Sequence, residues 1–210
     1  NSHIINKTET KTWVNCDMRN TAFYKNIAEK FKKKKIAFES VFSGFGLITN
    51  VIHYLDYIAY LTHSQEFTID PSGLESTPIP SRRKGFLEYN GTLRANFKDG
   101  STGSFSCYES NTPQIEIKIE CEDVHCQISD LKGEAIVSEK KNGGLEQRMP
   151  ASIPFQSQKT TSLVEELLDT GSCALTTYKE SKLIHLQLLE PLLMFLNQHS
   201  SKIYNFYPFT

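Results

Sequence analysis

The segment that most constrains the fold is IEIKIEC, residues 115–121, in which apolar and charged residues alternate at every position. A period of two predicts a strand with one apolar face and one polar face. Ile115, Ile117, Ile119 and Cys121 share the apolar face. Such a strand belongs in a sheet that is covered on one side only.

The neighbouring sequence predicts further antiparallel strands. Residues 86–97 and 102–110 are extended runs on either side of Asp99-Gly100, a tight-turn pair, and they have the form of a hairpin. Residues 124–130 follow Glu122-Asp123 as a second hairpin, and 134–140 add a third strand to this meander. Residues 36–42 are also extended, whereas 141–157 contain two glycines and two prolines and are expected to form a loop.

Helical periodicity appears on both sides of these strands. Apolar residues recur at three- and four-residue spacing in four segments, which are 20–34, 48–62, 160–171 and 176–199. Gly171 is expected to close the third helix, and Thr176 or Thr177 to begin the fourth. The sequence therefore predicts an α+β fold, a mainly antiparallel open sheet with helices packed on one face.

Composition excludes several classes of partner. The 210 residues are 39% hydrophobic and 22% charged, and the formal net charge is -1. This balance gives no attraction to nucleic acid or to an anionic membrane, and no apolar run approaches the roughly 20 residues of a membrane helix. The five cysteines are odd in number and scattered, so we expect free thiols in a reducing cytoplasm and no metal site.

One predicted helix carries polar residues where an apolar core helix needs none. The stretch SGFGLITNVIHYLDYIAYLT, residues 43–62, holds Thr49 and Asn50 at its start and His53 and Asp56 within the apolar run. An imidazole with a pKa near 6.5 can act as a general base at neutral pH, or it can be a hydrogen-bonded structural histidine. Asn50 can bind a sugar hydroxyl or cap the helix. Asp56 is expected to support packing or to orient His53.

Two more polar residues have open roles. Arg19 can pair with a substrate carboxylate or phosphate, or it can form a surface ion pair. His185 lies four residues after Ser181 on the last predicted helix, where it serves packing or faces a pocket. The sequence contains no GxGxxG, GxxxxGK[ST], GxSxG or HExxH motif.

Four segments in order resemble one family. They are WVNCDMRNTAFY (13–24), SGFGLITNVIHYLDYIAYL (43–61), LRANFKDGSTGSFS (93–106) and LVEELLDTGSCALTTYKESKLIHLQLLEPLL (163–193). Together they resemble the C-terminal half of the glucose–fructose oxidoreductase / inositol dehydrogenase-like (Gfo/Idh/MocA) dehydrogenases, from residue 13 to about 198. The resemblance implies a dihydrodipicolinate-reductase-like C-terminal domain. In the family, NAD or NADP binds a separate N-terminal Rossmann domain, and this domain also carries a Glu-Lys-Pro motif. We expect the Rossmann domain and the Glu-Lys-Pro motif to be absent from this chain. We therefore expect no cofactor site in it.

The resemblance implies a division of the chain and a set of site residues. Residues 1–16 would be a tail with the remnant of the last Rossmann strand, 17–200 the oxidoreductase domain and 201–210 a C-terminal tail. The usual family motif is Asp, three residues, then His, and it places the catalytic histidine at His53. Thr49 stands at the Asp position, and Asn50 matches a branch associated with bacterial surface-sugar biosynthesis.

The same resemblance implies partners. Thr49, Asn50, Arg19 and His185 would bind a sugar, sugar nucleotide or polyol, and the sheet would form a homodimer or tetramer. A domain of this kind is expected to be inactive alone. The alternative is a non-catalytic binding or dimerisation module built on the same fold.

Overall fold

The centre of the molecule is one eight-stranded sheet, with strand order β11-β10-β9-β8-β2-β7-β6-β3. The computed structural model describes residues 10–110, 112–151 and 154–209. The strands of this sheet are β2 (Ala37–Ser43), β3 (Phe67–Leu74), β6 (Gly91–Phe97), β7 (Thr102–Tyr108), β8 (Gln114–Glu120), β9 (Val124–Ser129), β10 (Glu134–Glu139) and β11 (Glu146–Pro150). Every neighbouring pair is antiparallel except β2 and β7, which are parallel, so the predicted mainly antiparallel sheet is confirmed.

The alternation in β8 has the predicted consequence. Ile117 and Ile119 are buried in the core, whereas Lys118 and Glu120 are exposed on the opposite face. The predicted hairpin around Asp99-Gly100 is formed by β6 and β7, and Gly100 has a φ of +86° that suits glycine. The hairpin strand β6 begins at Gly91 rather than at residue 86.

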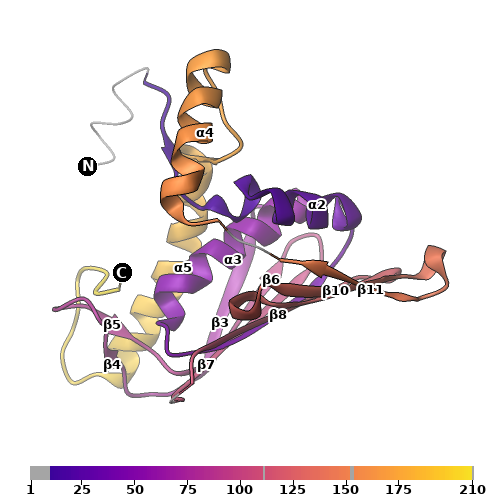
Figure 1. Ribbon diagram of the computed structural model, residues 1–210. Coiled ribbons are helices and arrows are strands. Elements are labelled where there is room, and N and C mark those ends of the chain that lie inside the picture. The colour runs from indigo at the N-terminus through magenta and orange to yellow at the C-terminus, as the bar shows by residue number, and fades with distance from the viewer. Residues whose placement is uncertain (1–9, 111, 152–153, 210) are drawn as a thin grey trace.

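Helices cover one face of the sheet (Figure 1). They are α2 (Ala22–Phe31), α3 (Leu47–Thr62) and α5 (Tyr178–His199), and their apolar residues join those of the strands in one core. α3 contacts β7, and α5 lies against both α3 and β3. A 3-10 turn, Asp17–Asn20, precedes α2 and also packs on α3. The predicted packing of helices on one face is confirmed.

α4 (Gln156–Thr170) differs from the other helices because none of its described side chains is buried. It ends at Gly171, whose φ of +65° and bond to the Leu167 carbonyl confirm the predicted cap. Near its start, Lys159 forms an ion pair with Asp17. In Figure 1 this helix stands at the end of the molecule that also holds the N-terminal segment.

Some elements differ from the sequence prediction. Residues 146–150, inside the predicted loop 141–157, form β11 because five backbone positions pair with β10. β3 received no prediction; it contains Pro71 and Gly73 and has an irregular register between Asp70 and Gly73. Two small sheets were also not predicted, one of β1 (Trp13–Val14) with β12 (Thr176–Thr177) and one of β4 (Ile79–Pro80) with β5 (Leu87–Glu88).

The two predicted tails touch the domain. β1 pairs with the residues that begin α5, so residues 13–14 are part of the folded unit. At the other end, Phe209 is buried against the ring of Tyr89, and the Leu87 N–H donates to the Pro208 carbonyl at 2.7 Å. These contacts fix the β4–β5 arm beside α5.

Candidate functional site

The first turn of α3 is capped by a residue from a distant part of the sequence. The N-cap position is Gly46, which has no side chain to accept a hydrogen bond. Glu88 of β5 takes this role: its carboxylate accepts from the Ile48 N–H at 2.7 Å and from the Thr49 N–H at 3.0 Å. The Thr49 hydroxyl also donates to Glu88. Glu88 is 3% exposed, so a buried carboxylate satisfies the helix N-terminus.

Asn50 is fixed on the same turn. Its Nδ2 donates to the Gly46 carbonyl at 2.6 Å, which is a bond to the N-cap residue but not a bond to a free helix N–H. The Asn50 side chain is therefore held in place with its carbonyl oxygen available as an acceptor. Thr49 and Asn50, both predicted site residues, thus lie together at the start of α3.

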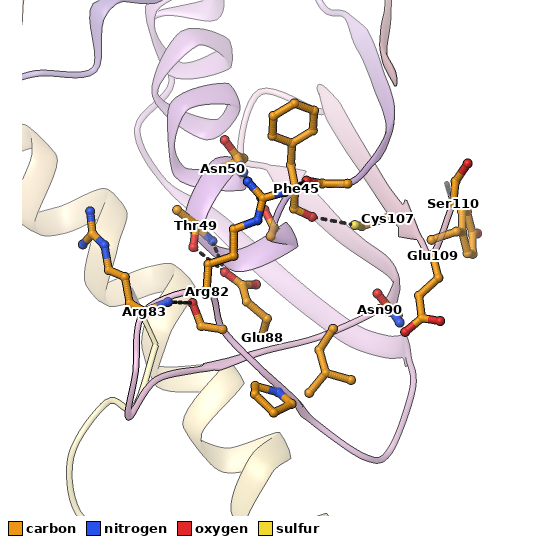
Figure 2. Close-up of a pocket in the computed structure, with 16 residues that line it drawn as sticks. Phe45, Thr49, Asn50, Arg82, Arg83, Glu88, Asn90, Cys107, Glu109 and Ser110 are labelled. Atoms are coloured by element: carbon orange, nitrogen blue, oxygen red, sulfur yellow. Dashed lines mark hydrogen bonds between the residues drawn. The ribbon is translucent and has the colours of Figure 1, made fainter. Parts of the chain in front are cut away.

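A cavity of about 630 Å³ opens at this helix start. Its walls come from the turn before α3, the arm formed by β4 and β5, and the C-terminal end of β7 (Figure 2). Residues that line it include Thr49, Asn50, Arg82, Glu88, Asn90 and Glu109. The volume is within the usual range for a small-molecule site, which is roughly 300–1,000 Å³.

His53 lies at a second, smaller cavity of about 170 Å³. Asp17, Tyr24 and Asp130 also line it, and Asn50 lines both this cavity and the larger one. The Nδ1 atom of His53 is buried and has no hydrogen-bond partner among the described residues. Burial lowers the pKa of His53, the charge of Asp17 opposes this change, and His185 and Lys159 reinforce it. A neutral imidazole with a free nitrogen can accept a proton.

Arg19 does not reach either cavity. Its Nε and one terminal nitrogen each donate to the Asp56 carboxylate at 2.8 Å, and the guanidinium lies over the ring of Tyr60. Thr176 donates to the same carboxylate. The ion pair that the sequence left open does form, but it is buried rather than on the surface. Asp56 therefore holds Arg19 and β12, and it makes no hydrogen bond to His53 among the described residues.

His185 lies on α5, where its Nδ1 is 2.7 Å from the Ser181 carbonyl oxygen and 3.1 Å from the Ser181 hydroxyl. The four-residue spacing thus brings the two side chains into contact on α5. His185 is near enough to influence the pKa of His53 but does not line either of the two cavities described above. The predicted site residues thus fall into a group of three (Thr49, Asn50 and His53), a neighbour (His185) and a separate buried pair (Arg19 with Asp56).

Several residues of the site were not predicted from the sequence. Arg82 comes from the β4–β5 arm, and Glu88 and Asn90 come from the run 86–97, which was predicted only as a strand of a hairpin. Only the Arg82-Arg83-Lys84 run was a local signal, and it resembles an ordinary solvated turn. Within the described ranges, no group of three or more His, Cys, Asp or Glu residues is arranged to hold a metal ion. None of the described helices is long and apolar enough to cross a membrane.

Comparison with known proteins gives a fold. No family model matches the sequence, and no curated protein matches it significantly. Solved structures do match. UDP-N-acetylglucosamine 3-dehydrogenase GnnA from Acidithiobacillus ferrooxidans superposes with a TM-score of 0.69 at 8% identity, covering 95% of this chain and 66% of that one. A putative NADPH-dependent oxidoreductase from Desulfitobacterium hafniense has a TM-score of 0.63 at 12% identity, covering 95% and 66%.

A third similar structure is not named as an oxidoreductase. It is a super-repressor mutant of Gal80p from Saccharomyces cerevisiae, with a TM-score of 0.61 at 10% identity over 96% of this chain and 69% of that one. The present chain spans about two thirds or less of the first similar structures. The fold that the family resemblance implies is therefore confirmed, and the likeness at these identities concerns the fold.

Proposed function

We propose that this chain is the substrate-binding and oligomerisation part of an NAD(P)-dependent oxidoreductase that acts on a CH–OH group of a sugar, sugar nucleotide or polyol. We further propose that this activity serves bacterial surface-polysaccharide biosynthesis. One observation carries the proposal: His53 has an unpartnered buried nitrogen and lines a small cavity that shares Asn50 with a ligand-sized cavity. The fold similarity to a UDP-N-acetylglucosamine 3-dehydrogenase and to a putative NADPH-dependent oxidoreductase supports it.

The proposed chemistry of this chain is removal of a hydroxyl proton. Because burial lowers the pKa of His53, its imidazole is neutral at pH 7 and can accept that proton. Asn50 is held by Gly46 and offers its carbonyl oxygen to a neighbouring hydroxyl of the substrate. The Glu88 carboxylate fixes the first turn of α3 through its hydrogen bonds, and this keeps Thr49 positioned at the cavity.

The cofactor needs residues other than these. A dinucleotide is normally held by a strand, a glycine-rich turn and a helix N-terminus, and the GxGxxG signature of that unit does not occur in the sequence. The residues of the candidate site do not fit a dinucleotide, so we assign them no step that involves it. In this proposal a separate nucleotide-binding domain supplies NAD or NADP, and the chain is inactive alone.

The proposed assembly is a homodimer or tetramer formed through the open face of the sheet. That face carries Glu39 and Val41 of β2 beside Lys118 and Glu120 of β8, all of them exposed. Acidic, basic and apolar groups on one surface allow self-complementary contacts about a two-fold axis.

The test is turnover by the protein of the complete reading frame that contains this sequence. Purified protein is assayed with NAD+ and NADP+ against a panel of sugars, sugar nucleotides and polyols. With the active substrate, His53→Ala should lower turnover about a hundredfold, the usual scale for a positioned acid–base group, and His185→Ala should have a smaller effect. Thermal melts accompany both variants. Near-normal turnover of His53→Ala together with a collapsed melting temperature would show that His53 is structural.

A second candidate is a non-catalytic binding or dimerisation module. The similarity to a super-repressor mutant of Gal80p favours it, because this fold then also occurs in a protein that is not named as a dehydrogenase. Stable self-association combined with no turnover on the whole panel, with either cofactor, would support this candidate over the first.

A further inference from the structure

The large cavity has two chemically different sides. On one side, Arg82 extends from the β4–β5 arm across the cavity mouth, where its guanidinium lies 5.9 Å from the centre of the Phe45 ring and donates to the Gly44 carbonyl (Figure 2). A guanidinium has five N–H donors, and this bond uses one side of the group. The remaining donors stay available to a ligand in the cavity.

The other side is uncharged or acidic. Asn90 is 7% exposed and lines the cavity. Its side-chain amide can both donate and accept hydrogen bonds. In Figure 2, Glu109 and Asn90 lie together on the side of the cavity away from Arg82. An amide and a carboxylate are well suited to bind hydroxyl groups.

Glu88 does not cancel the charge of Arg82 directly. Its carboxylate oxygens are already engaged by the Ile48 and Thr49 N–H groups and by the Thr49 hydroxyl. That negative charge therefore compensates the N-terminal end of α3. The cavity is left with a cationic group at the mouth and hydroxyl-binding groups at the opposite wall.

We propose that this cavity binds a phosphate ester of a polyhydroxy compound, with the phosphate at Arg82 and the hydroxyl groups at Asn90 and Glu109. This inference rests on the proposed function, because Thr49 and Asn50 belong to the same cavity, and it narrows the substrate to a phosphorylated one. The planar guanidinium can donate two parallel bonds to phosphate oxygens. Arg83, at the outer rim, adds positive charge that attracts a dianion.

The experiment compares each sugar with its own phosphate on the 210-residue chain. Glucose, galactose and N-acetylglucosamine, their 1-phosphates and inorganic phosphate are titrated by calorimetry at constant ionic strength. At least one 1-phosphate should bind ten times or more tighter than its parent sugar and than inorganic phosphate. Arg82→Gln should remove this preference while the parent sugar binds as before, and Asn90→Ala should weaken both forms.

Arg148→Gln is the matched control, because Arg148 is exposed on β11 and is not among the residues that line the cavity. Circular dichroism checks the fold of each variant, and Arg82 is exposed, so its replacement should not unfold the chain. The inference is overturned if no 1-phosphate binds better than its sugar, if inorganic phosphate binds as tightly as the ester, or if Arg82→Gln and Arg148→Gln act alike. Equal binding of sugars and their phosphates overturns this inference alone, since the proposed oxidoreductase function is judged separately by turnover of the complete protein.

Discussion

The Glu88 carboxylate and the Thr49 backbone lie 3.0 Å apart, although the two residues are 39 positions apart in the sequence. This contact joins the β4–β5 arm to the first turn of α3 and so determines the shape of the large cavity. Gly46 makes the contact possible: a Cβ atom at this position would lie 2.3 Å from a Glu88 carboxylate oxygen. The arm, the helix start and the glycine therefore form one structural unit.

Replacing the Glu88 carboxylate, which accepts hydrogen bonds from the start of α3, should destabilise the protein. Glu88→Gln replaces one oxygen by an NH2 group that cannot accept from a helix N–H, so we expect a loss of about 1–3 kcal/mol in the free energy of unfolding. Gly46→Ala should cost a similar amount because the new methyl group displaces the buried carboxylate. Urea denaturation measures both, with Glu146→Gln on the exposed strand β11 as control. Unchanged midpoints for both variants would contradict the assigned role.

Breaking the buried pair of Arg19 with Asp56 should destabilise the protein more strongly. Asp56→Asn leaves a buried guanidinium without its counter-charge, and such losses usually cost about 3–5 kcal/mol. The exposed pair of Lys98 with Glu66 is the control, for which Lys98→Gln should change stability by about 1 kcal/mol or less. Equal effects of the two substitutions, measured by urea denaturation, would be evidence against the buried ion pair.

Strict periodicity made most of the sheet predictable. The alternation of β8 and the Asp99-Gly100 turn are local signals, and both indicate the structure that forms. β3 and β11 have no such signal: Pro71 and Gly73 interrupt the first, and β11 has the sequence EQRMP, whose residues are mostly exposed. Such strands are determined by pairing with a neighbour, which is a tertiary effect.

The candidate site could be predicted only in part for a similar reason. Thr49, Asn50 and His53 lie within one helical turn, so their proximity follows from the sequence. Glu88 and Asn90 come close to them only through the fold of the β4–β5 arm. The sequence left Arg19 open between a substrate anion and a surface ion pair, and it gave no signal that its partner would be the buried Asp56.

The 210-residue chain should not bind NADH or NADPH. This expectation comes from the absence of a phosphate-cradling glycine loop in the sequence. Titration of either nucleotide, followed by its fluorescence, should show no saturable change. The protein of the complete reading frame is the positive control, and micromolar binding to the 210-residue chain would contradict the proposal that a separate domain holds the cofactor.

Association should depend on the exposed face of the sheet. We expect a homodimer or larger even oligomer in sedimentation velocity, and the double variant Val41→Arg/Lys118→Glu should shift it toward the 23.9 kDa monomer. The two substitutions add a bulky charge and reverse another on neighbouring strands of that face, which opposes self-complementary contact. Lys182→Glu on an exposed position of α5 is the control. A parent chain that is monomeric at high concentration would count against this assembly.

His53 should make the stability of the protein depend on pH. Burial lowers the pKa of His53 below its ordinary value of 6.5 in the folded state, so the unfolded chain binds the proton more readily. The free energy of unfolding is therefore highest above about pH 6.5, and it falls as the pH drops from there through the lowered pKa. Asp17 opposes this shift, whereas His185 and Lys159 reinforce it, so the neighbouring charges modulate the effect.

The difference between parent and variant isolates this contribution. His53→Gln has no titrating group at this position, so between pH 7.5 and 5 it should lose less stability than the parent chain. His125→Gln, at a more exposed imidazole on β9, controls for the loss of a histidine as such. Urea denaturation at half-unit pH intervals gives both curves. Parallel curves for the parent and His53→Gln would mean that His53 has the same proton affinity in the folded and unfolded chain, which would contradict the lowered pKa.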